Sequence, residues 1–317
     1  MSFNTLNEEV LWAQKYRPNT VSDTILPDKT KQAFQKFVDD QNIPNLLLSG
    51  PPGTGKTTSA IAMLKQLNCD YIIINGSLNG GIDTLRNEIS SFASSVSFAG
   101  GRKYVIIDEA DYLTPTTQAS FRNFIEEFSK NCGFIFTCNY KNRIIEPLRD
   151  SRFSVIDFSI TKDQRPKIAA QFFKRVIAVL DNENIDYDKK VVAKIIEKHF
   201  PDFRRVFNQL QSYSASGKID EGIFADVKHD NIDQLFEYLK NKDFKAMRKW
   251  CSDNSDQDMN EIFAKFYSMS DAYVAESSMP GVIVTLGEYQ YKHAFVADPE
   301  INMAAFLTEV MFEAQFK

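Results

Sequence analysis

The sequence is poor in the residues that build metal sites and disulfide frameworks. It has four cysteines among 317 residues, with no CxxC pair, and three histidines without ligand spacing. A zinc ribbon, a disulfide scaffold and a histidine metal site are therefore not expected, and the cysteines are interpreted as buried thiols. Because no apolar run could cross a bilayer and no signal pattern opens the chain, we expect a soluble intracellular protein without membrane partners.

The chain also lacks an excess of positive charge. Its 37 Lys and Arg against 42 Asp and Glu give a net charge of -5, which argues against a protein that coats nucleic acid with a basic surface. The charge is uneven: residues 1–160 carry -1, residues 161–225 carry +3 and residues 226–317 carry -7. The last third is thus a poor candidate for phosphate contacts, and the lone chain is predicted to bind DNA weakly.

The first half alternates short apolar runs with amphipathic stretches, which is typical of a parallel sheet with crossover helices. The runs are continuous in apolar residues, so helices are expected on both faces of the sheet. Thr114 before Pro115 predicts a helix start. The expected strands are 45–49, 71–75, 103–108, 134–138 and 153–158, and the expected helices are 56–68, 82–96, 115–130 and 146–150.

The strand signal stops at residue 161. Thr161 and Gln164 fit a capping box, and helical spacing recurs in 163–181, 188–199, 203–214 and beyond. The organisation predicted is an α/β domain at 1–160, a small helical domain at 161–225 and a helical domain at 226–317. Only charge and a possible turn at 229–231 mark the second boundary.

Residues 50–57 read Gly-Pro-Pro-Gly-Thr-Gly-Lys-Thr, which matches the phosphate-binding pattern GxxxxGK[ST] after an apolar strand. The glycines let backbone amides turn toward phosphates, and the following helix adds its N-terminal amides. Lys56 is the expected partner of the β and γ phosphates, and Thr57 the expected hydroxyl ligand of Mg²⁺. A chance glycine-rich turn is disfavoured by the strand–loop–helix context.

Two further strands end in polar residues. Asp108 follows an apolar strand and is expected in the Mg²⁺ shell, and Glu109 is the candidate to orient the attacking water. Asn139 follows the next strand, where its amide could bond water and γ-phosphate. The carboxylates could instead cap a turn, and Asn139 could be an ordinary turn residue.

These motifs resemble the AAA+ ATPases of the DNA sliding-clamp-loader group, and within it the ATPase subunits of T-even-type bacteriophage loaders. The likeness spans residues 12–211 and includes Asp-Glu-Ala-Asp at 108–111, Ser-Arg at 151–152 and Asp-Phe-Arg-Arg at 202–205. It implies an α/β fold: a P-loop AAA+ parallel-sheet domain, a helical lid domain and a helical C-terminal collar domain for oligomerisation.

The resemblance implies roles for single residues. Asn139 would be the first sensor, Arg204 the second sensor in cis, and Arg152 an arginine finger for the neighbouring subunit. Arg152 could instead pair with a local carboxylate such as Asp150, and Arg204 could belong to a solvated helix face. ATP and Mg²⁺ are the implied cofactors, with Thr57 and Asp108 holding the metal. The implied nucleotide-binding residues are Tyr16, Arg17, Pro18, Gly53, Thr54, Gly55, Lys56, Thr57 and Thr58.

For DNA, the resemblance points to the helix start at Ile82 and Asp83, with Arg86 and Arg122 as further phosphate contacts. Gly80 stands where relatives often carry a basic residue, and both arginines could equally be helix-surface charges.

The resemblance also suggests roles for one polar residue and for one apolar set. Gln118 lies where relatives carry a polar switch residue that couples DNA to Glu109. Phe92, Val96 and Phe98 could anchor the clamp, or simply pack on the sheet.

The expected function is that of a clamp-loader ATPase subunit, in which ATP binding opens the clamp and hydrolysis releases it closed on primer–template DNA. The implied partners are the sliding clamp, primer–template DNA, other copies of the chain and one distinct subunit, in a five-subunit ring. The implied location is the cytoplasm, that of the bacterial host if the protein is of phage origin. Another AAA+ motor of the branch-migration type, or an ATP-binding scaffold, remain the alternatives.

Overall fold

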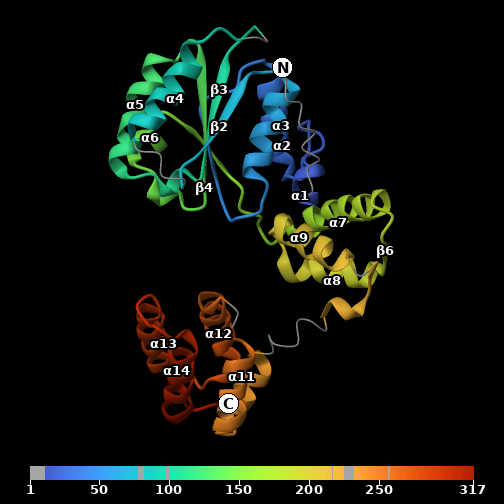
Figure 1. Ribbon diagram of the computed structural model, residues 1–317, viewed down its shortest axis with the longest axis vertical. Helices are drawn as coiled ribbons and strands as arrows, with labels where there is room; N and C mark the ends of the chain where they lie inside the picture. Colours follow the sequence, from blue (N-terminus) through green and yellow to red (C-terminus); the bar gives the residue numbers. More distant parts are fainter. Residues whose placement is uncertain (1–10, 78–81, 98–99, 216, 225–231, 256–257) are drawn as a thin grey trace. The chain divides into compact units, whose positions relative to one another are not determined.

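The computed structural model describes residues 11–77, 82–97, 100–215, 217–224, 232–255 and 258–317, with the backbone alone at 82–84 and 224. The chain divides into two compact units, Met1–Asp220 and Glu221–Lys317, and Figure 1 shows their elements. The α/β region and residues 161–220 of the lid region lie in the first unit. The finer boundaries at residues 160 and 225 stay predictions.

The first unit contains a five-stranded sheet in the order β2-β3-β4-β1-β5, and every neighbouring pair is parallel. The predicted parallel sheet is therefore confirmed; β2 and β3 have the predicted bounds, and ends of β1, β4 and β5 are shifted by one or two residues. Crossover helices separate the strands along the chain, as parallel pairing requires. The strands are β1 (Leu46–Ser49), β2 (Tyr71–Asn75), β3 (Lys103–Asp108), β4 (Cys132–Cys138) and β5 (Ser154–Asp157).

Helices cover both faces of this sheet, as the continuous apolar strands predicted (Figure 1). In β1, Leu47 packs into one apolar cluster while Leu46 and Leu48 pack into another, because alternate side chains of a strand point to opposite faces. The first cluster takes residues of α4 (Ile82–Ser94), α5 (Pro115–Glu127) and α6 (Glu146–Arg149), and the second of α2 (Asp28–Asp39) and α3 (Lys56–Gln66).

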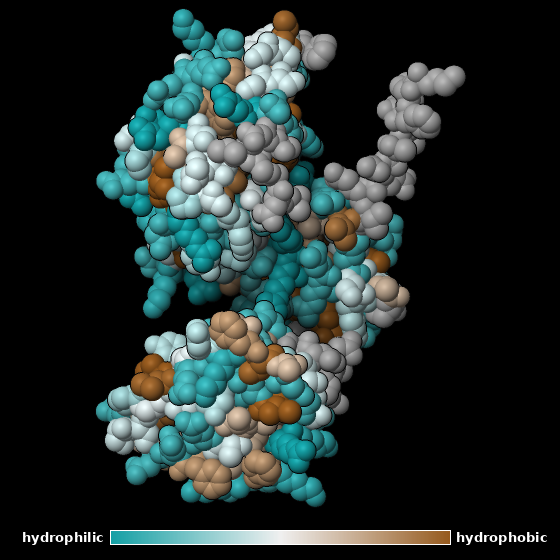
Figure 2. Space-filling view, turned by 60° about the vertical axis from the view of Figure 1, so that its left-hand side comes forward, coloured by the Kyte–Doolittle hydropathy of each residue, from teal (hydrophilic) through white to brown (hydrophobic). Residues whose placement is uncertain are grey.

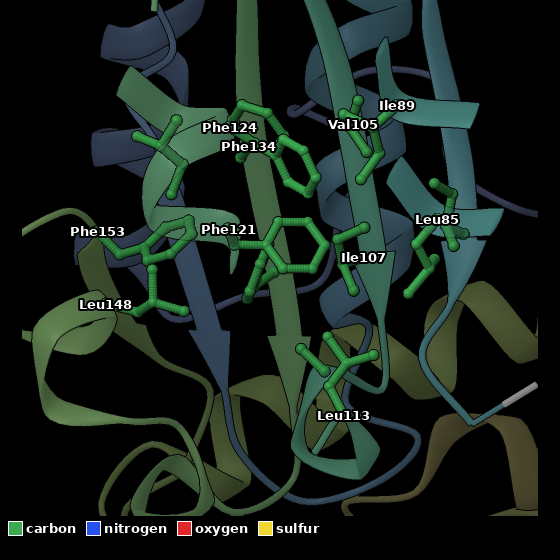
Figure 3. Packing of buried hydrophobic residues seen from close by; sticks show 14 of the residues in the cluster. Leu85, Ile89, Val105, Ile107, Leu113, Phe121, Phe124, Phe134, Leu148 and Phe153 are labelled. Atoms are coloured by element: carbon green, nitrogen blue, oxygen red, sulfur yellow. The ribbon is translucent and has the colours of Figure 1, made fainter. Parts of the chain in front are cut away.

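Aromatic rings fill the first of these clusters (Figure 3). Phe121 of α5 meets Phe136 of β4 edge to face, with ring centroids 5.0 Å apart, and Phe136 lies 4.6 Å from Phe153. The predicted helix start is confirmed, since the Thr114 hydroxyl accepts a hydrogen bond from the Thr117 amide. This packing fixes α5 and α6 on the sheet, and with them the segment that leads to Arg152.

The lid region follows the sheet in the same unit. Thr161 donates its amide to the Gln164 side chain at 3.1 Å, so the capping contact is confirmed, although the helix itself begins at Arg165. We expected no strand after residue 161, but two short strands occur there. Each has only two residues, which are too few to show an alternating pattern in the sequence. The lid contains α7 (Arg165–Asn182), β6 (Asp186–Tyr187), α8 (Lys189–His199), α9 (Phe203–Ser214) and β7 (Lys218–Ile219).

The second unit is helical in its described residues, as predicted. Phe236, Phe266 and Phe306 are buried in its core together with Trp250. The turn predicted at 229–231 lies outside the described residues. No helix in the described parts of the chain is long and apolar enough to span a membrane. The helices are α10 (Ile232–Lys240), α11 (Phe244–Asp253), α12 (Met259–Tyr273), α13 (Met279–His293) and α14 (Pro299–Glu313).

Candidate nucleotide site

The phosphate loop joins β1 to α3 at the carboxyl edge of the sheet, where parallel α/β folds bind their ligands. Gly53 and Gly55 take left-handed backbone angles, with φ of +71° and +90°, which residues with a side chain adopt at a cost. Because α3 begins directly at Lys56, its first amides have no partner within the helix and point into the loop. The loop therefore offers a concentration of amide donors to an anion.

Lys56 is buried inside this loop, with 8% of its surface exposed. Its ammonium donates hydrogen bonds to the Gly50 carbonyl at 2.6 Å, the Pro51 carbonyl at 2.8 Å and the Asn139 side-chain oxygen at 2.9 Å. Burial lowers the pKa of Lys56, and the nearby acidic groups Asp108 and Asp111 oppose that shift. The lysine thus lies where a phosphate could replace its carbonyl acceptors.

Thr57 and Asp108 form the candidate metal-binding pair. The Thr57 hydroxyl donates to Asp108 Oδ1 at 2.6 Å, and the Thr137 hydroxyl donates to the same oxygen at 2.5 Å. Hydroxyl and carboxylate oxygens are hard ligands, and Mg²⁺ is usually bound by one or two such groups together with substrate phosphates and water. No cluster of three acidic, histidine or cysteine ligands occurs among the described residues, so these two residues fit Mg²⁺ held together with a nucleotide.

Glu109 follows Asp108 with an unusual backbone conformation. Its φ is +57°, and its amide donates to the Thr137 hydroxyl at 3.1 Å. The Gly76 backbone packs against it so closely that a Cβ on Gly76 would lie 2.7 Å from the Glu109 carbonyl oxygen. Left-handed backbone at a non-glycine residue costs free energy and concentrates at functional sites. The backbone of Glu109 is therefore constrained directly after Asp108.

The loop opens into a cavity of about 350 Å³, within the range of small-molecule sites. Its lining comes from the phosphate loop with the start of α3, from residues 11–25, from Asp108 at the end of β3 and from the lid helices α7 and α9. The structure brings together there Asp108, Arg204 and the nine residues expected to bind nucleotide, namely Tyr16, Arg17, Pro18, Gly53, Thr54, Gly55, Lys56, Thr57 and Thr58.

Sequence reasoning missed several lining residues from the lid. Phe172, Arg175 and Phe207 face the cavity, yet in the sequence Phe172 and Phe207 read only as part of an apolar helix stripe. Their spacing marks a buried face but not what covers it. A weak signal in the sequence was that Phe207 follows the Asp-Phe-Arg-Arg motif on the same helix.

The start of α9 lies directly on the phosphate loop. The Phe203 amide donates to the Gly53 carbonyl at 3.1 Å, and the Asp202 carboxylate caps the helix by accepting from the Arg205 amide at 2.9 Å. A Cβ on Gly53 would lie 1.8 Å from Asp202 Oδ1. These contacts place Arg204 at the cavity of its own chain, where its positive charge adds slightly to the lowering of the Lys56 pKa that burial causes.

The segment expected to pack on adenine is tied to the lid as well. Arg175 donates to the Tyr16 carbonyl at 3.1 Å, while Lys15 and the Tyr16 hydroxyl donate to Glu183 at 2.7 and 2.5 Å. The hydrogen bonds from Lys15 and then Tyr16 hold the pKa of Glu183 below its usual value. The lid is thus bonded to both ends of the cavity, at the phosphate loop and at residues 15–16.

Arg152 does not line the cavity of its own chain. Its Nη2 donates to Glu126 at 2.7 Å and its Nη1 to the Pro147 carbonyl at 2.8 Å. The alternative expectation, a pairing with a carboxylate of the same chain, is met in kind, but the example given was wrong, because Asp150 pairs with Arg149 at 2.6 Å. The local carboxylate is Glu126, which α5 brings close from 26 positions away.

Among the described residues considered for DNA and clamp contacts, Arg86, Arg122, Phe92 and Val96 do not line the cavity. Arg86 and Arg122 are exposed on α4 and α5. The helix α4 begins at Ile82, but the side chains of Ile82 and Asp83 lie outside the described residues, as does Phe98. Val96 is 88% exposed, whereas Phe92 is partly buried against the sheet.

Gln118 is buried, and its side-chain bonds are made to backbone groups. Its amide nitrogen donates to the Leu113 and Arg143 carbonyls, each at 3.0 Å, and its oxygen accepts from the Ile145 amide at 2.8 Å. These bonds join the loop after the acidic motif to the segment before α6. None of these bonds involves Glu109 itself.

Comparison with known proteins agrees with this geometry. A family model described as "ATPase family associated with various cellular activities (AAA)" matches residues 46–160. A second, described as "Sliding-clamp-loader large subunit, AAA+ ATPase lid domain", matches residues 164–225. The first matched region contains the sheet and the phosphate loop, and the second contains the lid helices.

Similar curated proteins cover almost the whole chain. The sliding-clamp-loader large subunit of Enterobacteria phage T4 is 36% identical over 324 residues, which are 99% of this chain and 99% of that protein. The replication factor C small subunit of Saccharolobus solfataricus is 32% identical, over 97% of this chain and 96% of that protein.

Similar solved structures include the Thermotoga maritima RuvB Holliday junction branch migration motor. It is 17% identical, with a TM-score of 0.52 over 71% of this chain and 79% of that one. At that identity the likeness concerns the fold alone.

Proposed function

The chain belongs to the sliding-clamp-loader family of AAA+ ATPases, and on that basis we propose that it drives the loading of a sliding clamp onto primer–template DNA. ATP binding opens the clamp and allows primer–template DNA to bind, and hydrolysis releases the clamp closed around the DNA. In this role ATP acts as a ligand that selects one state of an assembly.

One observation supports this proposal above the others. Arg204 lines the cavity of its own chain, whereas Arg152 lies outside it. An arginine finger supplied in trans acts on the nucleotide of a neighbouring subunit, and the position of Arg152 outside its own cavity fits that role. We infer sites that are completed between subunits, so hydrolysis depends on assembly.

Within each site, the residues of the chain divide the work. Lys56 exchanges its carbonyl acceptors for β and γ phosphate oxygens, and Asn139, already bonded to Lys56, contacts the γ-phosphate and the water. Glu109 orients that water and accepts its proton. Thr57 and Asp108 would hold Mg²⁺, which when bound neutralises charge on the β and γ phosphates. Arg204 draws the lid onto the nucleotide.

The proposed base contacts come from two segments. Tyr16, Arg17 and Pro18 pack against adenine, and the lid side chains Phe172 and Phe207, which line the same cavity, supply apolar wall. Because residues 15–16 are bonded to Arg175 and Glu183 of the lid, base binding and lid position are coupled.

The proposed partners are the clamp, primer–template DNA, further copies of the chain and one distinct subunit, in a five-subunit ring. DNA phosphates would meet the start of α4 at Ile82 and Asp83, together with Arg86 and Arg122. The exposed Val96 fits a clamp anchor. Such contacts position the protein on DNA without recognising the base sequence, and a ring would combine the contacts of several subunits.

The C-terminal unit fits the role of the collar that holds such a ring. Figure 2 shows apolar side chains on its surface among polar ones, and large hydrophobic side chains stay exposed on α13 and α14. Val284, Ile301 and Phe312 are 70%, 67% and 68% exposed. Exposed apolar patches mark interaction sites, and the net charge of -7 in residues 226–317 argues against DNA there.

The expected location is the cytoplasm, that of a bacterial host if the protein is of phage origin.

The test is an ATPase assay of the assembled protein with and without primer–template DNA and the cognate clamp. Together they are expected to stimulate turnover, and a Glu109→Gln variant is expected to bind ATP without turning over. Stimulation by a four-way junction but not by primer–template DNA would favour a branch-migration motor. Repeated clamp loading by Glu109→Gln would favour an ATP-binding scaffold. Turnover that neither DNA nor clamp changes would overturn the proposal.

A further inference from the structure

Asp111 is a buried carboxylate with no assigned role in the proposed nucleotide site. It is 6% exposed and lies in the short helix η1 (Ala110–Tyr112), just after the acidic pair that ends β3. Burying a carboxylate costs free energy unless hydrogen bonds compensate. The compensating donors are therefore informative.

Those donors come from the end of β4. The amides of Asn139 and Tyr140 both donate to Asp111 Oδ2, each at 3.1 Å. These are the first two residues after the strand, where the ladder no longer supplies partners to the backbone. The carboxylate thus replaces the sheet as the acceptor for the loop that carries Asn139.

We propose that Asp111 is a positioning residue for ATP hydrolysis, which sets the place of the Asn139 side chain against Lys56 and the γ-phosphate. The contacts form one continuous chain: Asp111 Oδ2 to the Asn139 amide, and the Asn139 side-chain oxygen to the Lys56 ammonium at 2.9 Å. Hydrogen bonds to an ionised acceptor are stronger than neutral ones. This inference rests on the proposed role of Asn139 as a sensor.

The contact geometry argues that Asp111 does more than cap a loop. Asp111 binds two consecutive amides with one oxygen, which constrains the position and the direction of the chain leaving β4. The second oxygen, Oδ1, is buried and has no hydrogen-bond partner among the described residues, so the loop contact is the one the geometry optimises.

A small error in the place of a catalytic group is costly. Displacement of about 1 Å by a change away from the chemistry can lower a rate by ~10²-fold. Without Asp111, the amides of Asn139 and Tyr140 lose this acceptor, and the loop loses the contact that holds Asn139 in place. We expect a slower chemical step with nucleotide binding retained, because the hydrogen bonds of Asp111 go to the loop after β4 and not to the phosphate loop.

The experiment compares Asp111→Ala, Asp111→Asn and Asn139→Ala, singly and as the double variant Asp111→Ala/Asn139→Ala, in the full assembled protein. Basal ATP hydrolysis and the binding of a fluorescent ATP analogue are measured without DNA or clamp. Asp188→Ala is the matched control, because Asp188 also accepts a backbone amide, that of Lys190 at 2.7 Å, but at the start of the lid helix α8.

We expect kcat to fall by about 10–100-fold in Asp111→Ala, with KM changed less than about threefold. Asp111→Asn keeps a neutral acceptor for both amides and should stay within about fivefold of wild type. The double variant should be no slower than Asn139→Ala, since residues that act as a unit are not additive. If Asp111→Ala does not fold, Asp111→Ser, whose shorter hydroxyl cannot hold both amides in place, takes its part.

Three results would overturn the inference: wild-type turnover in Asp111→Ala, a loss that adds to that of Asn139→Ala, or an equal loss in Asp111→Asn and Asp111→Ala. Wild-type turnover in Asn139→Ala would remove the sensor role as well. Failure of clamp or DNA stimulation would touch the proposed function but not this inference, because the readout is basal hydrolysis.

Discussion

Arg152 is bonded to Glu126, whose carboxylate accepts a 2.7 Å hydrogen bond from the guanidinium. Glu126 is 66% exposed, and such surface pairs contribute only about 0–1 kcal/mol. A γ-phosphate of a neighbouring subunit could therefore displace Glu126 at little cost. The contact orders a long side chain without locking it, which is the arrangement that a residue serving another subunit needs.

Arg152→Ala should abolish most ATP turnover of the assembly, by about 10³-fold or more, while each subunit still binds nucleotide. The reason is that Arg152 lies outside its own cavity. Steady-state hydrolysis and equilibrium binding of a fluorescent ATP analogue measure the two effects. Arg149→Ala, which removes the neighbouring arginine paired with Asp150, is the matched control and should stay near wild type. Equal losses in both variants would contradict a trans finger.

Arg204→Ala should weaken ATP binding by about 10–100-fold, the equivalent of losing one hydrogen bond to a charged group. Arg204 lines the cavity of its own chain, whereas the next residue, Arg205, does not. Titration with a fluorescent ATP analogue gives the affinity, and Arg205→Ala is the control for loss of a positive charge on α9. An affinity that falls equally in both variants would indicate a general charge effect.

Gly53→Ala should destabilise the nucleotide-free chain more than Gly55→Ala. Both positions have left-handed backbone, so both variants carry a strain of about 1–3 kcal/mol. Only at Gly53 does the new Cβ meet a neighbour, Asp202 Oδ1 at 1.8 Å, and that carboxylate caps α9. The extra cost is about 1 kcal/mol or more if the cap is lost. The urea unfolding midpoints of the two variants measure this difference. Equal midpoints would mean that Asp202 moves away freely.

Stability should fall at alkaline pH because of buried thiols. Burial raises the pKa of Cys251 to about 12, so above the ordinary pKa near 9 the unfolded chain releases a proton that the folded chain keeps. The stability contribution is complete below pH 9 and is lost progressively as the pH rises toward 12. Its slope is ~1.4 kcal/mol per pH unit for this one thiol.

The measurement for this prediction is the free energy of unfolding at pH 8, 9 and 10. Cys251→Ala should be less stable than wild type at pH 8, because it leaves a small cavity. Its stability should then decline less steeply with pH. Parallel declines in the two proteins would show that Cys251 does not titrate in this range. Cys132 and Cys138, whose pKa values burial raises to about 11, add to the slope in both proteins.

The local elements could be predicted because their causes are local. Thr114 and Pro115 define the start of α5 by cap geometry, and β1 is recognised from three consecutive leucines at 46–48. The phosphate loop was equally predictable, since its glycines are required by the backbone angles that Gly53 and Gly55 adopt. In each case the physical reason lies within a few residues of the feature.

The partners of the charged groups were not predictable. Sequence reasoning considered Asp150 for Arg152, because proximity along the chain is all that a sequence shows. The structure instead pairs Arg152, in the turn after α6, with Glu126 of α5. Asp111 likewise read as the end of an acidic motif, and its bonds to the amides of Asn139 and Tyr140 appear only once β3 and β4 are neighbours.

By itself, the sequence determined that this chain has a parallel sheet, a phosphate loop and a helical remainder, because turn geometry, capping and hydrophobic period are short-range properties. The tertiary structure decided which residues meet at the site. The sheet order brings the ends of β1, β3 and β4 side by side, and the lid contributes Phe172 and Arg204 to the cavity. Such contacts depend on packing between distant segments, which no local pattern of residues encodes.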